Sequence, residues 1–285
     1  MEPRVFGAEP SKLDVRTFTY TPRPFTNHAG GQRYAPEDIE DQSKVGICTA
    51  ISLTQHARKA LGQRFSADFQ YLIQKRFYDN NWEEGSSIFT ALRAARGIGL
   101  LPESEWKHTT LKDRDLPYHQ YIEKLKAIPM DEIGRLILIA NKTRLKAFAS
   151  VPVTRDTLAR AIAENPAGII VRFNVGEEWY TDRNGKVSWH KNDLEPLRPP
   201  ARILSGHAII ESNFVGNSFR VANTWGKEWC DNGTAYSLYW EYRPTEAWVV
   251  YYNEVPAAIQ AKLEARTAWT GKFLDYVQKL LNHFI

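Results

Sequence analysis

The hydrophobic pattern of this 285-residue chain changes its period near Ala167. Before that point apolar residues recur mostly at helical spacing. After it, short β-branched runs separated by turn residues predict strands. Helices therefore dominate the first half and strands the second, which predicts an α+β fold in two lobes. A chain of this length has ample capacity to bury such a core.

The helical half contains several segments whose ends are marked by capping residues. Apolar spacing predicts helices over residues 48–61, 67–78, 87–96, 118–127 and 154–164. Gly62 is expected to end the first helix, and Ser66 is expected to cap the second. Residues 129–150 show no clear period and are left unassigned.

The second half carries strand and turn signals. Strands are predicted over residues 167–173, 203–214, 218–224 and 234–240, with a turn at Gly216-Asn217 and a hairpin signal at Asn184-Gly185. The proline-rich residues 1–40 predict extended chain. Residues 253–285 predict an amphipathic C-terminal helix that packs on the body, mediates self-association or, least favoured, binds a membrane surface.

The composition excludes several classes of protein. The formal charge is +4 and the basic residues are scattered, so no nucleic-acid partner is expected. With only Cys48 and Cys230, a disulfide framework is absent. No run of eighteen apolar residues predicts a membrane span, and no apolar leader is present in residues 1–19. We therefore expect a cytoplasmic location or export without a leader.

Four residue types point to acyl-transfer chemistry. Cys48 stands at the start of a predicted helix, where backbone N–H groups favour a thiolate. His207 would act as its general acid and base, between the small residues Gly206 and Ala208. Asn223 would orient the imidazole. Gln42 and the Cys48 backbone N–H would stabilise an oxyanion.

The spacing of these residues resembles that of the papain-like cysteine proteases. Gln42 precedes Cys48 by six positions, and Asn223 follows His207 by sixteen. The segment from Asn223 to Gly233, NTWGKEWCDNG, is similar to the family pattern N-S-W-G-x-x-W-G-x-x-G. Thr49, after the nucleophile, resembles bacterial members. The resemblance implies a helical lobe at about 42–128 and an antiparallel, β-barrel-like lobe at about 150–252, with an active-site cleft between them.

The same resemblance implies further roles. Gly85 and Ser86 match the segment that holds substrate in an extended form, and Ala208 lines the pocket for the second residue before the cut. Trp225 would border the substrate site and shield the His207–Asn223 bond from water. A polypeptide substrate is implied, with no cofactor and no metal. Cys230 replaces a glycine of the family pattern.

Three functional hypotheses remain open from the sequence. The first is a cysteine endopeptidase that works through a thioester, in a peptidase domain spanning residues 26–252. The second keeps this machinery for a cell-wall peptide amide or an isopeptide. The third is a catalytically silent peptide-binding protein. Residues 1–25 are too short to copy the family's helical propeptide. They are expected to form an extended strap over part of the cleft or a disordered tail.

Overall fold

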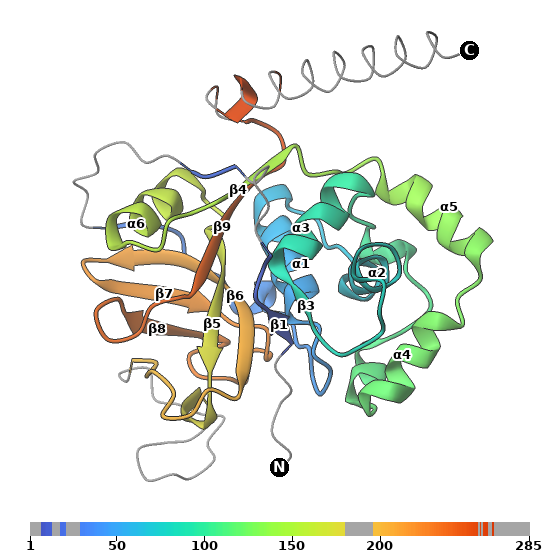
Figure 1. Ribbon diagram of the computed structural model, residues 1–285, viewed down its shortest axis with the longest axis horizontal. Helices are drawn as coiled ribbons and strands as arrows, with labels where there is room; N and C mark the ends of the chain where they lie inside the picture. The colour runs from blue at the N-terminus through green and yellow to red at the C-terminus, as the bar shows by residue number, and fades with distance from the viewer. Residues whose placement is uncertain are drawn as a thin grey trace, which may run out of the picture.

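The computed structural model describes residues 7–12, 18–20, 29–179, 196–255, 257, 259–261 and 264. Helices α1 to α5 form one side of the molecule, and the main sheet with α6 forms the other (Figure 1). Helix α1 and the short strand β1 lie at the boundary between them. The expected two-lobed α+β fold is confirmed.

The helical elements follow the expected order. Their bounds are η1 Pro36–Asp38, α1 Cys48–Leu61, α2 Ala67–Ile73, η2 Gln74–Asp79, α3 Ile88–Gly97, η3 Glu103–Glu105, η4 Leu111–Asp115, α4 Tyr118–Lys126, α5 Met130–Ala140, α6 Arg155–Glu164 and η5 Glu177–Trp179. Gly62 adopts φ +70° and donates its N–H to Arg58 O, which ends α1 as predicted. Ser66 Oγ accepts a hydrogen bond from Phe69 N and caps α2, also as predicted.

The β-rich lobe is built on one antiparallel sheet. Its strands are β2 Ala29–Gly31, β4 Ala147–Ser150, β5 Ile169–Val175, β6 Ser205–Val215, β7 Ser218–Ala222, β8 Thr234–Leu238 and β9 Glu246–Tyr251. They run in the order β4-β9-β5-β6-β7-β8, and β2 also pairs with β6. Among the described residues the end strands β4 and β8 do not pair with each other. The expected barrel-like lobe is therefore an open sheet.

Several local predictions differ from the structure. The helix expected over 67–78 changes to a π-helix, η2, at Gln74. The unassigned residues 129–150 contain α5 and strand β4, and β9 was not predicted. Strands β4 and β9 pair across about a hundred residues of sequence, so no local pattern indicates them. The hairpin signal at 184–185 and most of the C-terminal segment lie outside the described residues.

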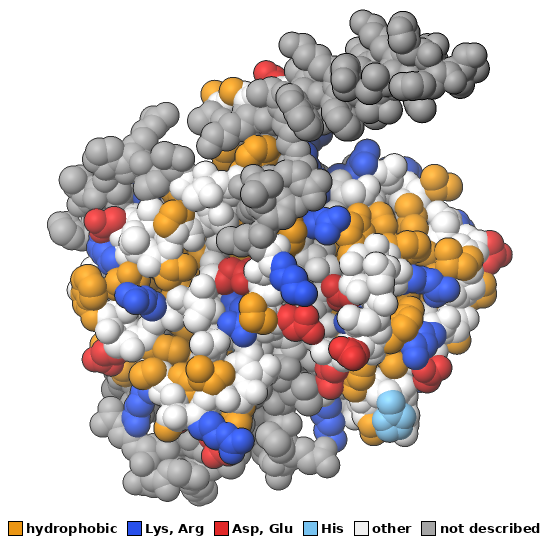
Figure 2. Space-filling model, in the orientation of Figure 1, with side chains coloured by type: hydrophobic (Ala, Val, Ile, Leu, Met, Phe, Trp, Pro, Cys, Tyr) orange, Lys and Arg blue, Asp and Glu red, His pale blue; other side chains and the backbone are white. Residues whose placement is uncertain are grey.

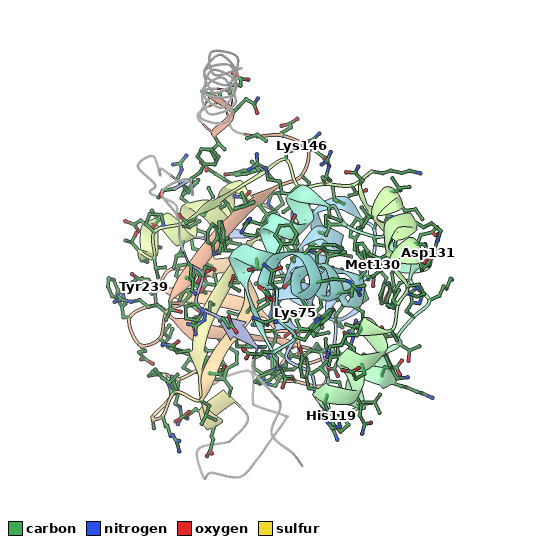
Figure 3. All side chains as sticks on the ribbon, turned by 45° about the vertical axis from the view of Figure 1, so that its right-hand side comes forward. Lys75, His119, Met130, Asp131, Lys146 and Tyr239 are labelled. Carbon is green, nitrogen blue, oxygen red and sulfur yellow. The ribbon has the colours of Figure 1, made fainter. Side chains whose placement is uncertain are left out.

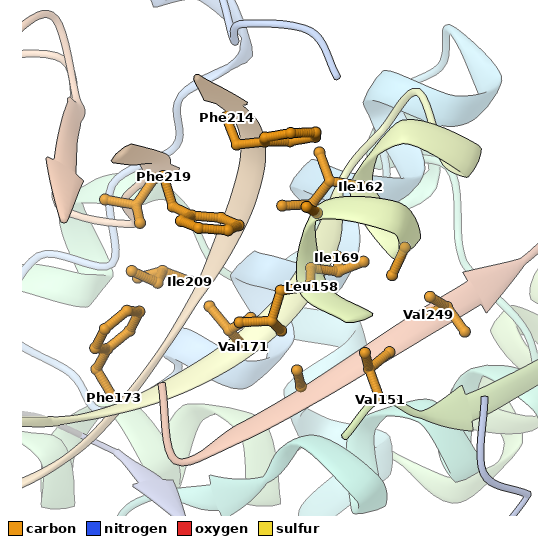
Figure 4. Close-up of a cluster of buried hydrophobic side chains, with 14 of the residues drawn as sticks. Val151, Leu158, Ile162, Ile169, Val171, Phe173, Ile209, Phe214, Phe219 and Val249 are labelled. Atoms are coloured by element: carbon orange, nitrogen blue, oxygen red, sulfur yellow. The ribbon is translucent and has the colours of Figure 1, made fainter. Parts of the chain in front are cut away.

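The core of the β-rich lobe forms where α6 packs on the sheet. Leu158 and Ile162 of α6 contact a layer of sheet side chains that includes Val171 and Phe214 (Figure 4). In the helical lobe, apolar side chains also gather on the outer surface beside α5 (Figure 2), where Leu138 is 71% exposed. No helix in the described part of the chain is long and apolar enough to cross a bilayer.

We predict that Leu158→Ala destabilises the protein by about 2–5 kcal/mol, because it leaves a cavity beneath α6 that the packed sheet cannot fill. The matched control Leu138→Ala, on the exposed face of α5, should cost less than about 0.5 kcal/mol. Urea unfolding followed by tryptophan fluorescence measures both. Equal losses for the two variants would contradict the assignment of this core.

Candidate active site

Cys48 is the first residue of α1 and is completely buried. The preceding turn is anchored by Val45 and Ile47, both fully buried. Ile47, the N-cap residue, provides no side-chain hydrogen bond, and no acidic residue lies in the first turn of α1. The backbone N–H groups and the dipole at this helix start therefore act on the Cys48 sulfur without a competing carboxylate.

His207 approaches Cys48 from strand β6 of the other lobe. The backbone amide of Ala208, the residue that follows His207, lowers the pKa of the Cys48 thiol and therefore lies close to it. One turn further along α1, Ser52 Oγ donates to Ala208 O over 2.8 Å. These two contacts fix the start of α1 against β6. They bring the predicted nucleophile and the predicted base to the same point on the lobe boundary.

Asn223 is hydrogen-bonded to the imidazole of His207. Its Oδ1 lies 2.7 Å from His207 Nε2 and also accepts a hydrogen bond from Thr224 N. This arrangement assigns the ring proton to Nε2 and leaves Nδ1 for proton exchange with a nucleophile. Trp225 covers the ring, with centroids 4.8 Å apart, and Trp179 meets it edge-on at 5.7 Å. Both indoles exclude water from the His207–Asn223 bond, which strengthens it.

Gln42 is held beside Cys48 by a residue that the sequence analysis did not single out. Thr224 Oγ1 donates to Gln42 Oε1 over 2.7 Å, and Gln42 N donates to Thr224 O. The side-chain oxygen of Gln42 is thus occupied, and its Nε2 is turned toward the turn before Cys48, 3.2 Å from Val45 O. The only sequence signal for Thr224 was its position inside the NTWG motif.

The predicted substrate-binding segment is held from beneath by buried polar groups. Lys75 Nζ donates to Gly85 O over 2.8 Å, and this lysine is only 1% exposed. Lys75 is labelled in Figure 3, among the helices. Gly85 N donates to Tyr71 Oη over 3.1 Å. Gly85 and Ser86 are buried, and Ser86 begins the short strand β3, Ser86–Ser87. A rigid extended edge therefore lies beside the nucleophile.

Glu84 ties this segment to the turn that precedes Cys48. Its Oε1 accepts a hydrogen bond from Gly46 N over 2.7 Å. Burial raises the pKa of the Glu84 carboxyl, and the hydrogen bond from Gly46 opposes that rise. Both described cysteines are free, so this polar contact holds the two segments together without a disulfide.

Residues 7–12, here called the N-terminal strap, lie across the site. Strand β1, Ala8–Glu9, pairs in parallel with β3. Gly7 lies between the predicted substrate segment and Cys48: its carbonyl accepts from Ser86 N over 2.7 Å, and its backbone amide lowers the pKa of the Cys48 thiol. Residues 8 and 9 are thus extended in the structure, as a strand beside β3.

Further contacts fasten the strap along the β-rich lobe. Arg172 Nε donates to Ala8 O over 2.9 Å, and Ser11 N donates to Glu246 Oε2 over 3.0 Å. The strap approaches so closely that a Cβ atom on Gly206 would lie 2.1 Å from Ala8 O. The strap backbone thus fills the space that the missing side chain of Gly206 leaves beside His207.

The buried setting determines the ionisation of the nucleophile. Burial raises the pKa of the Cys48 thiol, and hydrogen bonds from backbone amides, that of Ala208 foremost, oppose the rise. A raised pKa keeps the sulfur protonated at neutral pH, so the strapped state carries a thiol rather than a reactive thiolate. Among the described residues, no cluster of three or more His, Cys, Asp or Glu side chains could hold a metal ion.

Comparisons with known proteins agree with this arrangement. No protein-family model and no curated protein matches the sequence. Among solved structures, xylellain, a cysteine protease from Xylella fastidiosa, is similar with a TM-score of 0.72 and 20% identity, over 89% of this chain and 99% of that one. Procathepsin L 3 of Tenebrio molitor has a TM-score of 0.58 and 13% identity, over 86% and 75% of the two chains.

A plant enzyme shares the fold at lower identity. The bromelain protease from Ananas comosus, in complex with the E64 inhibitor, has a TM-score of 0.53 and 12% identity, over 80% of this chain and all of that one. These similarities extend over 80 to 89% of this chain. The chain therefore has the two-lobed fold of the papain-like cysteine proteases.

Proposed function

We propose that this protein is a cysteine peptidase that cleaves polypeptides through a thioester intermediate. The observation that carries the proposal is the convergence of Cys48, at a helix start, with a buried His207–Asn223 pair from the opposite lobe. The papain-like fold supports the same reading, because cysteine proteases are its structural relatives. A reactive thiol needs both a base and an orienting group, and the site provides them.

The chemistry follows from the geometry. His207 Nδ1 takes the Cys48 proton, and the thiolate attacks the peptide carbonyl carbon to form a C–S bond. The oxyanion is stabilised by the N–H of Cys48 and by Gln42 Nε2. The C–N bond then breaks as His207 returns its proton to the departing amine. A water molecule, deprotonated by His207, hydrolyses the thioester and restores the thiol.

We further propose that the strapped state is latent. Gly7 presents an N–H to the sulfur, whereas attack requires a carbonyl carbon there. The strap also occupies the edge of Ser86 and the space beside Gly206 that an extended substrate needs. Displacement of the strap would expose Cys48 to water and lower its pKa, because burial is the main cause of the rise.

Replacing the nucleophile tests the function directly. Cys48→Ala should lower kcat on peptide substrates at least several thousandfold, because no other group can form the acyl intermediate. A thiol-directed epoxide should label the parent chain with the strap removed and leave Cys48→Ala unlabelled. Cys230→Ala, the matched control, should keep labelling and turnover. Residual Cys48→Ala activity within tenfold of the parent would refute the assignment.

Displacing the strap should increase thiol reactivity. We expect removal of residues 1–12 to raise the rate of Cys48 alkylation at pH 7 by about tenfold or more, because the sulfur becomes solvated and ionises more readily. Gly7→Ala should act in the same direction, since its Cβ would lie 2.0 Å from Gly46 O. Lys12→Ala is the control at the end of the strap. An unchanged alkylation rate in both strap variants would contradict latency.

Glu84 should act as a positioning residue. Glu84→Ala removes the acceptor for Gly46 N and should lower kcat by about tenfold, which corresponds to the loss of roughly 1.4 kcal/mol. Glu84→Gln keeps an acceptor oxygen and should recover most of the rate. The exposed neighbour provides a control, Glu83→Ala, with no expected effect. If the Gln and Ala variants are equally impaired while both remain folded, the positioning role is wrong.

A further inference from the structure

A cavity lies at the boundary of the two lobes, beside the segments that contain Gln42 and Trp225. Its volume is about 440 Å³, and its walls come from both lobes. The segment 39–41 and the segment 226–228 form one side, and the loops around α2 and η4 form the other. Nothing in the proposed reaction uses this space, although it begins one residue from Gln42 and one residue from Trp225.

The two segments on the near side pair with each other. Asp41 forms an antiparallel bridge with Trp225, and Gly226 N donates to Glu40 O over 3.0 Å. The same ladder continues to the hydrogen bond from Gln42 N to Thr224 O. A molecule bound in the cavity would therefore contact the backbone that holds Gln42 and Trp225 in place. Gln42 is the proposed oxyanion donor, and Trp225 packs on the imidazole of His207.

The cavity has an excess of negative charge. It is lined by five carboxylates and three basic side chains, namely Glu40, Asp41, Asp68, Glu103, Glu228, Arg64, Arg114 and Lys227. Most of the charged side chains inside the cavity already have a hydrogen-bond or ion-pair partner. Arg114 Nε donates to Asp68 Oδ1 over 2.9 Å and its Nη1 donates to Asp41 O, while Arg64 pairs with Glu103 at 3.7 Å.

Among the described residues, Glu40 and Glu228 are the cavity carboxylates whose side chains make no hydrogen bond or ion pair, and Glu40 is the less exposed of the two. Its backbone is fully used, because Glu40 N donates to Gln55 Oε1 and its carbonyl accepts from Gly226. Its carboxylate receives no hydrogen bond or ion pair within 4.0 Å from any residue in the described part of the chain. Burial raises the pKa of Glu40 to about 7, and the charge of Arg114 opposes the rise.

Apolar surface adjoins this carboxylate. Trp106, only 8% exposed, lines the cavity, and its Nε1 is already bonded to Thr109 Oγ1 over 2.9 Å. Ile39 and the 57% exposed Leu111 add to the apolar wall. A carboxylate beside an indole and aliphatic groups suits a ligand that has a cationic end and an apolar stem.

We propose that this interlobe cavity binds an alkylammonium or guanidinium group, with Glu40 as its counter-ion and Trp106 beside its stem. The chemistry is that of a lysine or arginine side chain. It can come from the polypeptide substrate or from a free amine. Binding stands independently of catalysis, whereas any effect on turnover rests on the proposed peptidase function.

Direct binding is tested on the full-length Cys48→Ala protein by isothermal titration calorimetry at pH 8. The probe is N-acetyl-lysine methylamide, and N-acetyl-norleucine methylamide is the neutral control of similar stem length. We expect the lysine derivative to bind at least tenfold more tightly than norleucine. Glu40→Gln should remove that preference, while Glu37→Gln, an equal charge change on an exposed neighbour outside the cavity, should retain it.

The pH dependence provides a second measurement. The charged groups that face Glu40 are Arg114, Asp68, Arg64 and Glu103 from the helical lobe, Asp41 beside it, and Lys227 and Glu228 from the β-rich lobe. The lining contains no histidine, so ionisation of Glu40 should dominate near neutrality. Affinity for the lysine probe should fall roughly tenfold from pH 8 to pH 6, and this change should vanish in Glu40→Gln.

Kinetic measurements on the active protein distinguish a cationic group of the substrate from a free amine. If the group belongs to the substrate, Glu40→Gln should lower kcat/KM for lysine-containing peptides and not for their norleucine counterparts. If it is a free amine, the lysine probe should change kcat/KM for both peptides equally. Equal affinity of lysine and norleucine probes for the Cys48→Ala protein, or unchanged lysine binding in Glu40→Gln, would overturn the proposal whatever the fate of the peptidase assignment.

Discussion

The contact between the start of α1 and strand β6 is the constraint on which the site depends. Neither lobe holds the proposed catalytic pair alone, because Cys48 belongs to the helical lobe and His207 to the sheet. Two hydrogen bonds join the lobes on either side of Cys48. Ser52 Oγ donates to Ala208 O, and Thr224 Oγ1 donates to Gln42 Oε1. Any shift along this boundary would separate the thiol, the imidazole and the oxyanion donors together.

A buried reactive pair creates a conflict that the N-terminal strap resolves. Exclusion of water strengthens the His207–Asn223 bond, yet the same exclusion raises the pKa of Cys48 and disfavours the thiolate. In the proposed latent state, the strap takes the place of an extended substrate and presents an N–H in place of a carbonyl carbon. The fold can thus hold complete machinery in a protonated, covered state.

Buried polar contacts stabilise this scaffold where disulfides are absent. Lys75 supports the carbonyl of Gly85, Glu84 holds Gly46, and the Arg114–Asp68 pair fixes the loops below the oxyanion turn. Such groups are costly to desolvate and stabilise a structure only when their partners are in place. They therefore favour one arrangement of the loops over many alternatives of similar compactness.

Features that depend on local chemistry could be predicted from the residues alone. Gly62 and Ser66 marked helix ends, because a left-handed cap and a side-chain cap act within one turn. The spacing of Gln42, Cys48, His207 and Asn223 identified the candidate machinery and the resemblance that implied its fold. The tertiary structure decided what depends on distant partners. It placed β4 beside β9, laid Gly7 on Cys48, set Glu84 against Gly46 and left Glu40 facing a cavity. These contacts join segments far apart in the chain, and their energies come from burial and shape that no local pattern records.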